Sequence, residues 1–233
     1  FDLDGESWTY IIGKSTYNAG SAETRYSSRA EAHNTLTINP DEKFSQVAGS
    51  FAELVRHEEN EHGAYAVYDM TQLYPAADSL YRGFYIGDDY STITVRDEMH
   101  FNTDSNGYWF MSTEAEPTML DENTVILTKN GKSLVMQIEA EAENYTLSVM
   151  NAEPLPSSPK VEGDNTYPNV KKVAIYFEGK DVTLTVRMGT FGGVVDTTPI
   201  DAWKPPQAAT GQAEGDFSYR LYVDGQLCEN SDK

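Results

Sequence analysis

Apolar and polar residues alternate with a period of two along several short stretches of the chain. In NTLTI, Leu36 and Ile38 share one face of an extended segment and the threonines share the other. The same alternation recurs in YSTITV at 90–95 and in DVTLTV at 181–186. Successive side chains of an extended chain point to opposite faces, so this period predicts β-strands with one buried face.

Turn residues separate these stretches. Asn130-Gly131 lies between two apolar runs and predicts a two-residue type I′ hairpin, because both turn positions then require φ > 0. The sequence of residues 223–227 predicts a second hairpin, and Asn106-Gly107 predicts another turn. Turn signals every 8–12 residues or so indicate roughly a dozen strands. The expected fold is therefore all-β, a large two-sheet antiparallel β-sandwich.

The chain shows no internal repeat and no low-complexity segment, so we expect one β-sandwich domain over residues 1–233. Two segments rich in Pro, Gly, Ser and Asp, 151–168 and 197–216, are expected to be long surface loops of that domain. The sequence starts with a strand-like FDLDGESWTY and has no initiator methionine. We therefore interpret it as the C-terminal part of a longer chain.

Charge narrows the set of partners. The 233 residues include 17 basic and 37 acidic side chains, which give a formal net charge of −20. Such a field repels nucleic acid, acidic membranes and sulfated glycans, so neither a nucleic-acid nor a membrane partner is expected. A solvated acidic surface that keeps the protein soluble explains the same charge. No apolar run reaches the roughly 20 residues that span a bilayer, and the single Cys228 excludes an internal disulfide.

The stretch RYSSRAEAHNTLTINP carries the main candidate chemistry. His33 stands at the start of a predicted strand and follows Arg25 and Arg29. A histidine there can bind a metal ion or brace a loop; a zinc site needs three or four ligands, and no H-x-H or H-x₃-H spacing is present. The two arginines can clamp a carboxylate bidentately, or pair with the nearby Glu23 and Glu31.

Signatures of other chemistries are absent. The sequence contains no G-x-S-x-G, no P-loop, no Rossmann glycine pattern and no C-x-x-C. His57 and His62 flank an acidic run and fit a solvated loop between strands, and His100 is expected to end a strand. Exposed aromatic side chains can form flat platforms for sugar rings, although most aromatics on alternating strand positions belong to a core. The candidates are Trp8, Tyr10, Trp109 and Trp203.

Several stretches, in order, resemble the heparinase II/III-type polysaccharide lyases. They are DGESW, IIGKSTY, RYSSRAEAHNTLTIN, YRGFYIGDDYSTITVRDEM, YWFMSTEAE, LTKNGKSLVMQI and EPLPSSPKVEGDNTYPNVKKVAIYF. The resemblance runs over residues 1 to about 190, and its most specific piece is R-x-x-x-H-N-T-L at Arg29–Leu36.

The resemblance implies an architecture and a reaction. Lyases of this type join an N-terminal (α/α) toroid to a large antiparallel β-sandwich and cleave uronic-acid polysaccharides by β-elimination. A tyrosine and a histidine act as base and acid, and an asparagine neutralises the uronate carboxylate. The family places these groups before the start of this chain. The resemblance thus implies a C-terminal β-sandwich that is inactive alone, supports the toroid and lines the substrate cleft.

The resemblance also implies site residues and a setting. His33 corresponds to a metal ligand of zinc-bearing members, while Arg25, Arg29, Asn34 and Tyr17 are expected to contact substrate or the domain interface. The expected partners are the toroid and a polysaccharide, in an extracellular or periplasmic location.

Two departures from the family pattern bear on zinc. The position of a second, aspartate ligand falls at or near Ile11, and Ser112 stands where a histidine is common. Zinc is therefore expected, if at all, only in the full-length enzyme, and the alternative for His33 is a hydrogen bond that braces the interface. The alternative for the whole chain is a non-catalytic module, either a carbohydrate-binding domain or a structural β-sandwich.

Overall fold

The computed structural model describes residues 1–13, 25–41, 45–87, 90–208, 221–223 and 226–228, and it confirms an all-β fold. Within these ranges the regular structure consists of fourteen strands and four single-turn 3-10 helices. The strands are β1 (Asp2–Leu3), β2 (Glu6–Ser7), β3 (Leu36–Ile38), β4 (Glu53–Asn60), β5 (Gly63–Asp69), β6 (Ala77–Gly87), β7 (Thr92–Thr113), β8 (Glu116–Asp121), β9 (Thr124–Lys129), β10 (Lys132–Glu141), β11 (Asn144–Ala152), β12 (Tyr167–Gly189), β13 (Leu221–Val223) and β14 (Gln226–Cys228). The 3-10 helices are η1 (Tyr26–Ser28), η2 (Ala30–Ala32), η3 (Thr71–Leu73) and η4 (Ile200–Ala202).

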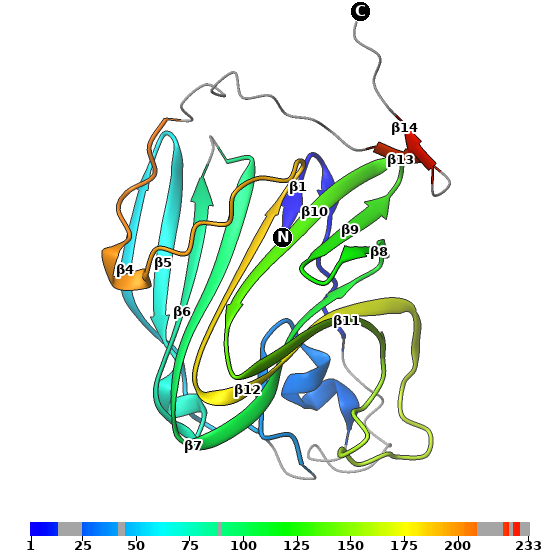
Figure 1. The fold of residues 1–233 in the computed structure, drawn as a ribbon. Helices are drawn as coiled ribbons and strands as arrows, with labels where there is room; N and C mark the ends of the chain where they lie inside the picture. Colours follow the sequence, from blue (N-terminus) through cyan, green and yellow to red (C-terminus); the bar gives the residue numbers. More distant parts are fainter. Residues whose placement is uncertain (14–24, 42–44, 88–89, 209–220, 224–225, 229–233) are drawn as a thin grey trace, which may run out of the picture.

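Ten strands form one antiparallel sheet that folds over on itself. Its main path is β4-β5-β6-β7-β12-β10-β9-β8, while β3 pairs with β7 and β11 pairs with β12. The strands β7 and β12 are 22 and 23 residues long and bend sharply at the bottom of the view in Figure 1. The pairing of β12 with β7 shifts register between Gly179 and Asp181. A bulge at a bend lets one strand pass between layers.

The bend divides the sheet into the two layers of a sandwich. On one side of the bend, the N-terminal half of β7 and the C-terminal half of β12 pair with β6 and β10 and form part of the large layer, β4-β5-β6-β7-β12-β10-β9-β8. On the other side, the N-terminal half of β12 pairs with β11 and the C-terminal half of β7 pairs with β3, which gives the small layer β3-β7-β12-β11. The predicted sandwich is therefore correct, and its two layers share their two longest strands.

The core lies between the facing surfaces of the two layers. Phe101 and Phe177 stack there with their ring centroids 6.4 Å apart and their planes 7° apart. The alternating residues predicted to face inward do so. Leu36, Ile38, Val182, Leu184 and Val186 are all buried in the main core cluster. Burial of a side chain of this size stabilises the folded state by about 1.5–3 kcal/mol.

The predicted hairpins are confirmed. Asn130 and Gly131 have φ values of 52° and 75°, the left-handed conformation that a type I′ turn demands. They join β9 to β10, with Lys129 opposite Lys132. The strands β13 and β14 pair antiparallel around residues 224–225, as the sequence of 223–227 predicts.

The predicted turn at Asn106-Gly107 is wrong, because both residues lie inside β7, where Gly107 pairs with Phe177. The glycine serves close packing instead. A Cβ at position 107 would lie 2.6 Å from Cζ of Phe177 and 2.7 Å from the carbonyl oxygen of Thr37. His100 likewise lies within β7 and does not end it. Its Nδ1 is 2.5 Å from a carboxylate oxygen of Asp181, across the bend.

Irregular segments cover the outer surfaces of both layers. Most of the predicted loop 151–168 lacks regular structure, although its ends belong to β11 and β12. Residues 190–208, called the strap below, leave the end of β12 and cross in front of β6 and β5 before running along β4 (Figure 1). The strap holds the described part of the predicted loop 197–216, whose residues 209–216 lie outside the described ranges. In those ranges no helix is long and apolar enough to cross a membrane.

Candidate functional site

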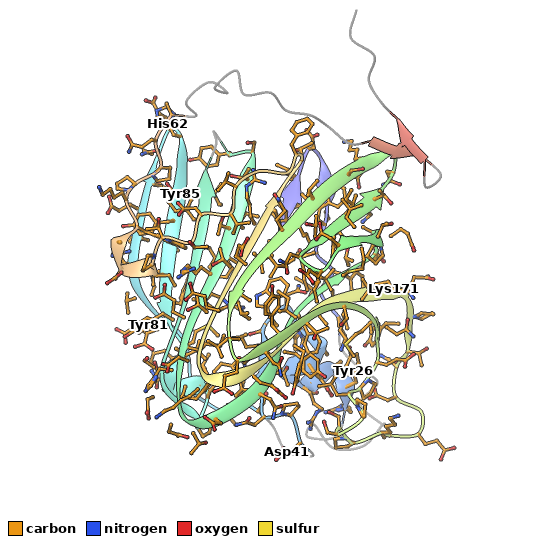
Figure 2. All side chains as sticks on the ribbon, in the orientation of Figure 1. Tyr26, Asp41, His62, Tyr81, Tyr85 and Lys171 are labelled. Atoms are coloured by element: carbon orange, nitrogen blue, oxygen red, sulfur yellow. The ribbon has the colours of Figure 1, made fainter. Side chains whose placement is uncertain are left out.

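The family-like motif, residues 25–35, is called the HNT segment below. It consists of the two 3-10 turns η1 and η2, after which the chain enters β3. The segment packs on the outer face of the small layer, and Figure 2 shows the label of Tyr26 beside this short helical stretch. Its apolar side chains form a small cluster of their own. The buried members are Ile12, Tyr26, Ala32, Ala152 and Val170.

Glu31 is the anchor of the HNT segment. Its side chain is 1% exposed, and one carboxylate oxygen accepts from Nε of Arg29 at 3.2 Å. The other oxygen accepts from the backbone N–H of Leu155 at 3.0 Å and from the hydroxyl of Ser158 at 2.8 Å. Arg29 also donates to the carbonyl of Asp41 at 2.6 Å. Of the two roles open to Arg29, the structure shows the pairing with Glu31.

Lys172 of β12 completes this buried cluster. Its side chain is 0% exposed, and Nζ donates to the carbonyls of Glu31 at 3.2 Å and Glu153 at 3.3 Å. The ammonium lies 4.2 Å from the ring centroid of Phe110 and 5.4 Å from that of Tyr26, within cation–π range. Burial lowers the pKa of Lys172 to about 8, although the negative charges of Glu31 and Glu153 act to raise it.

Tyr26 shares this dry environment. Burial raises the pKa of its hydroxyl well above the usual value, and the charge of Glu31 adds to the effect. A phenol held protonated in this way is unsuited to act as a base near neutral pH. Sequence reasoning missed Lys172, but one signal was available. Lys172 alternates with the apolar Val170 and Ala174, so it lies on the face of its strand that the HNT segment covers.

His33 and Asn34 bind backbone atoms. Nε2 of His33 lies 3.1 Å from the carbonyl oxygen of Ser27, so the tautomer that carries a proton on Nε2 donates to it. The Asn34 amide donates to the carbonyl of Tyr10 at 3.1 Å and accepts from the backbone N–H of Ser112 at 2.7 Å. These bonds tie the start of β3 to β7 and to the N-terminal segment.

A zinc site needs three or four ligand side chains close together. Within the ranges that the structure describes, no group of three or more His, Cys, Asp and Glu side chains could hold a metal ion. Ser112, one of the two positions at which the sequence departs from the expected zinc pattern, donates its backbone N–H to the Asn34 side chain at 2.7 Å. The described residues therefore do not fit a zinc site, and no chemical step is derived through zinc.

Of the two remaining predicted site residues, Arg25 follows the undescribed range 14–24 and Tyr17 lies within it. Arg25 is partly buried, and its Nε has no hydrogen-bond partner among the residues that the structure describes. Tyr17 lies outside the described residues. Arg29, His33 and Asn34 thus each bind a different part of the protein, with no partner shared among these bonds, and the role of Tyr17 stays a prediction.

The aromatic platforms predicted from sequence are mostly core. Trp8 and Trp109 are 1% and 4% exposed, so neither can stack on a sugar, and Nε1 of Trp8 donates to the carbonyl of Leu3 at 3.1 Å. Tyr10 is half-buried against the cluster beneath the HNT segment. Trp203 is the exception, because it is half-buried in the strap on the outer face of the large layer.

The strap encloses a groove that sequence reasoning did not find. Its volume is about 730 Å³, and it lies between the strap and strands β6, β7 and β12. Tyr85 and Trp203 form part of its lining, with their ring centroids 5.5 Å apart and their planes at 75°. Figure 2 places Tyr85 at the upper left and Tyr26 at the lower right, so the groove and the HNT segment are well separated.

No protein-family model matches the chain, and no curated protein is significantly similar to it in sequence. Solved structures do match. Heparan sulfate lyase HepC from Pedobacter heparinus superposes with a TM-score of 0.58 at 18% identity, over 79% of this chain and 28% of HepC. A mutant of HepC gives a TM-score of 0.57 over the same shares.

A heparinase III gene product matches with a TM-score of 0.50 at 13% identity, over 70% of this chain and 24% of that protein. The relationship is one of fold. At these identities it is distant, and the chain spans 28% or less of the length of the solved lyases described here.

Proposed function

We propose that this chain is the β-sandwich domain of a heparinase II/III-like polysaccharide lyase that acts on uronic-acid glycans by β-elimination. In this role the domain supports a helical toroid and lines one wall of the substrate cleft. The observation that carries the proposal is the coincidence of two independent findings. The fold superposes on the HepC structure with a TM-score of 0.58, and the R-x-x-x-H-N-T-L stretch of the family lies in that same sandwich.

The contacts of the HNT segment support a positioning role. Glu31, Asn34 and Lys172 bind backbone atoms from three different parts of the chain, namely the loop after β11, the strand β7 and the N-terminal segment. Such contacts hold the segment rigidly, which is what a cleft wall requires. The elimination itself needs a base and an acid within hydrogen-bond reach of substrate. Under this proposal the toroid supplies them.

The proposal fixes a setting and the partners. The partners are the toroid domain of the same protein and a uronic-acid polysaccharide. Such polymers are met outside the cytoplasm, so the enzyme would work in an extracellular or periplasmic compartment. If the intact enzyme binds zinc, His33 would be the contribution of the described residues, and the other ligands would come from elsewhere in the protein.

The test compares this chain with the longer protein that the proposal implies, a helical toroid followed by this sandwich. Both are incubated with heparin, heparan sulfate and alginate, and the absorbance of unsaturated uronate is followed. We expect no turnover by the 233-residue chain and turnover of at least one polymer by the longer protein. Turnover by the short chain would contradict a supporting role. A longer protein without a helical region, or without lyase activity, would overturn the assignment itself.

A matched pair of variants in the longer protein assigns the role of His33. His33→Ala is compared with His57→Ala, which changes a histidine of β4 on another part of the sandwich. Lost zinc in the metal analysis of His33→Ala alone would establish a ligand role. If the metal content stays unchanged while Tm falls, His33 acts as a brace through its bond to the carbonyl of Ser27.

A second candidate function, a carbohydrate-binding module, is favoured by one specific observation. The groove under the strap combines aromatic rings, hydroxyls and charged groups on a sheet face. This function does not exclude the first, because lyases and binding modules both handle glycans.

A further inference from the structure

The outer face of the large layer is polar where the strap crosses it. Four residues lie in one row across adjacent strands, with Tyr65 opposite Tyr85, Tyr85 opposite Thr94 and Thr94 opposite Arg187. Rings and short or charged polar groups thus occupy the positions that a covered sheet face normally gives to aliphatic side chains. A face of this composition is suited to a polar ligand that also has flat apolar surfaces.

The strap is held at a fixed height above this face. On one side, Nη1 of Arg187 donates to the carbonyl of Phe191 at 2.9 Å, and Gln137 accepts from the N–H of Gly193 at 2.7 Å. On the other side, Arg56 donates to the carbonyls of Ile200 and Asp201. These anchors keep the groove open, at a volume of about 730 Å³. Ligand sites of proteins commonly have volumes of about 300–1,000 Å³.

Rigid aromatic groups line the groove. The Tyr85 ring stacks on Tyr65 with centroids 6.3 Å apart, and the Trp203 indole meets it edge-on. Nε1 of Trp203 donates to the carbonyl of Thr198 at 3.0 Å, which fixes the indole. Rings held in this way offer apolar contact to a ligand with little further loss of conformational freedom.

The charges in the lining favour an anion. Among the residues that the structure describes, Arg187 and Lys204 contribute two cations to the groove lining and Asp196 contributes one carboxylate. That carboxylate already accepts from the N–H of Thr198 at 2.9 Å and from its hydroxyl at 2.6 Å. Lys204 is exposed and forms no ion pair with any residue that the structure describes. The whole chain has a formal net charge of −20, so the excess of cations over carboxylates among these lining residues is a local feature.

We propose that the groove under the strap binds an oligosaccharide that carries carboxylate groups, with Tyr85 and Trp203 against the sugar rings and Lys204 and Arg187 toward the carboxylates. The hydroxyl of Thr94 and the carboxylate of Asp196 face the sugar hydroxyls. The surrounding negative charge favours unsulfated ligands over heavily sulfated ones. This inference rests on the second candidate function, which it deepens by naming the ligand class, and it is independent of the lyase assignment, so either can fail without the other.

Intrinsic fluorescence gives a direct readout, because the chain has three tryptophans and two of them, Trp8 and Trp109, are buried. A ligand in the groove therefore changes the emission of Trp203. The 233-residue chain is titrated at low salt with an alginate hexasaccharide, an unsulfated oligouronate, and with cellohexaose as a neutral match. We expect the tryptophan emission to change saturably with the oligouronate, and added salt to weaken this binding. Cellohexaose at equal concentration should leave the emission unchanged.

Variants locate the binding. Lys204→Ala is expected to weaken oligouronate binding about fivefold, the effect of one charge-assisted contact at an exposed site. Lys180→Ala, at an exposed position beside the bend of β12, is the matched control and should bind like the wild type. Trp203→Ala, followed by calorimetry, should abolish binding while the far-ultraviolet circular dichroism stays that of a β-sheet protein.

Three results would overturn the inference. They are no saturable binding of the oligouronate, equal binding of cellohexaose, and equal affinities of the wild type and Lys204→Ala.

Discussion

Two irregular segments, the HNT segment and the strap, cover opposite outer faces of this sandwich, and charged side chains hold both by binding backbone atoms. In the HNT segment, the Glu31 carboxylate accepts from the N–H of Leu155. At the strap, Arg56 donates to the carbonyls of Ile200 and Asp201. The two differ in their access to water. Glu31 is 1% exposed, whereas Lys204 in the strap is exposed.

This difference in exposure separates buried charges, which stabilise the fold, from exposed charges, which can bind a ligand. A fully buried charge network must be complete, because a remaining unpaired charge has lost its water and gained nothing in return. Charges at the edge of a solvated groove exchange protein contacts for water at little cost. The HNT segment is therefore expected to respond to mutation through stability, and the strap through ligand binding. Four changes, from the largest expected effect to the smallest, test this contrast.

Glu31→Ala should have the largest effect. It leaves Arg29 buried without its carboxylate partner and removes the negative charge near the buried Lys172, which is expected to lower the free energy of unfolding by about 3–5 kcal/mol. Urea denaturation measures this change. Glu162→Ala, at an exposed position of the neighbouring loop, is the control and should stay within about 0.5 kcal/mol of the wild type. A loss below 1 kcal/mol for Glu31→Ala would remove the contrast.

The pKa of Lys172 predicts a pH dependence. Its value of about 8 in the folded protein is below its ordinary value of 10.5. Between these values the unfolded chain binds more protons, so the free energy of unfolding rises with pH. From pH 7 to pH 9.5 the gain is about 2 kcal/mol. Above pH 10 the raised pKa of Tyr26 acts in the opposite direction.

Lys172→Met should lack this gain, while Lys171→Met should keep it, because Lys171 is only partly buried. Urea titrations of the three proteins at several pH values measure the slopes. The same pH response in Lys172→Met and in the wild type would show that another group is responsible.

Gly83→Ala should affect the strap and spare the HNT segment. A Cβ at position 83 would lie 2.4 Å from Cη2 of Trp203, so the indole must move outward. We expect a red shift of the tryptophan emission and a loss of about 1–2 kcal/mol, at the lower end for overpacking because the strap can yield. Gly13→Ala, with no atom within 4 Å of its Cβ, is the control. Unchanged emission of Gly83→Ala would contradict the predicted displacement.

Arg56→Ala should have the smallest effect on stability. It removes two bonds to strap carbonyls at a partly exposed site, worth about 1 kcal/mol together. The strap should nevertheless open more often, which limited proteolysis and amide exchange of residues 200–203 would detect. Lys180→Ala provides the comparison. Protection of these residues at the wild-type level would mean that other contacts hold the strap.

Local features of the fold could be predicted because their causes are local. The alternation at Leu36 and Ile38 assigns the buried face of a strand whatever its partner. Asn130-Gly131 specifies its hairpin because a type I′ turn needs two positive φ values. The resemblance to polysaccharide lyases comes from several ordered stretches, of which the motif at 29–36 is the most specific, and the fold comparison supports a distant structural relationship.

Features that depend on distant contacts could not be predicted. Asn106-Gly107 is the same dipeptide as the true turn. Position 107 nevertheless needs glycine because a Cβ there would clash with the ring of Phe177, seventy positions further along the chain. Trp109 and Trp203 were both candidates for an exposed aromatic platform. One lies in the core and the other in the groove, and only the course of β7 and of the strap separates them.

The sequence by itself determined the strands, their buried faces and the tightest turns, since period and turn chemistry act over a few residues. The tertiary structure decided where the sheet bends, which charges lose their water and where a groove remains open. Burial of Lys172 beside Glu31, and the placing of Lys204 at the groove, both arise from segments that meet across the fold. Desolvation depends on such meetings, and it makes one set of charges structural and leaves the other able to bind a ligand.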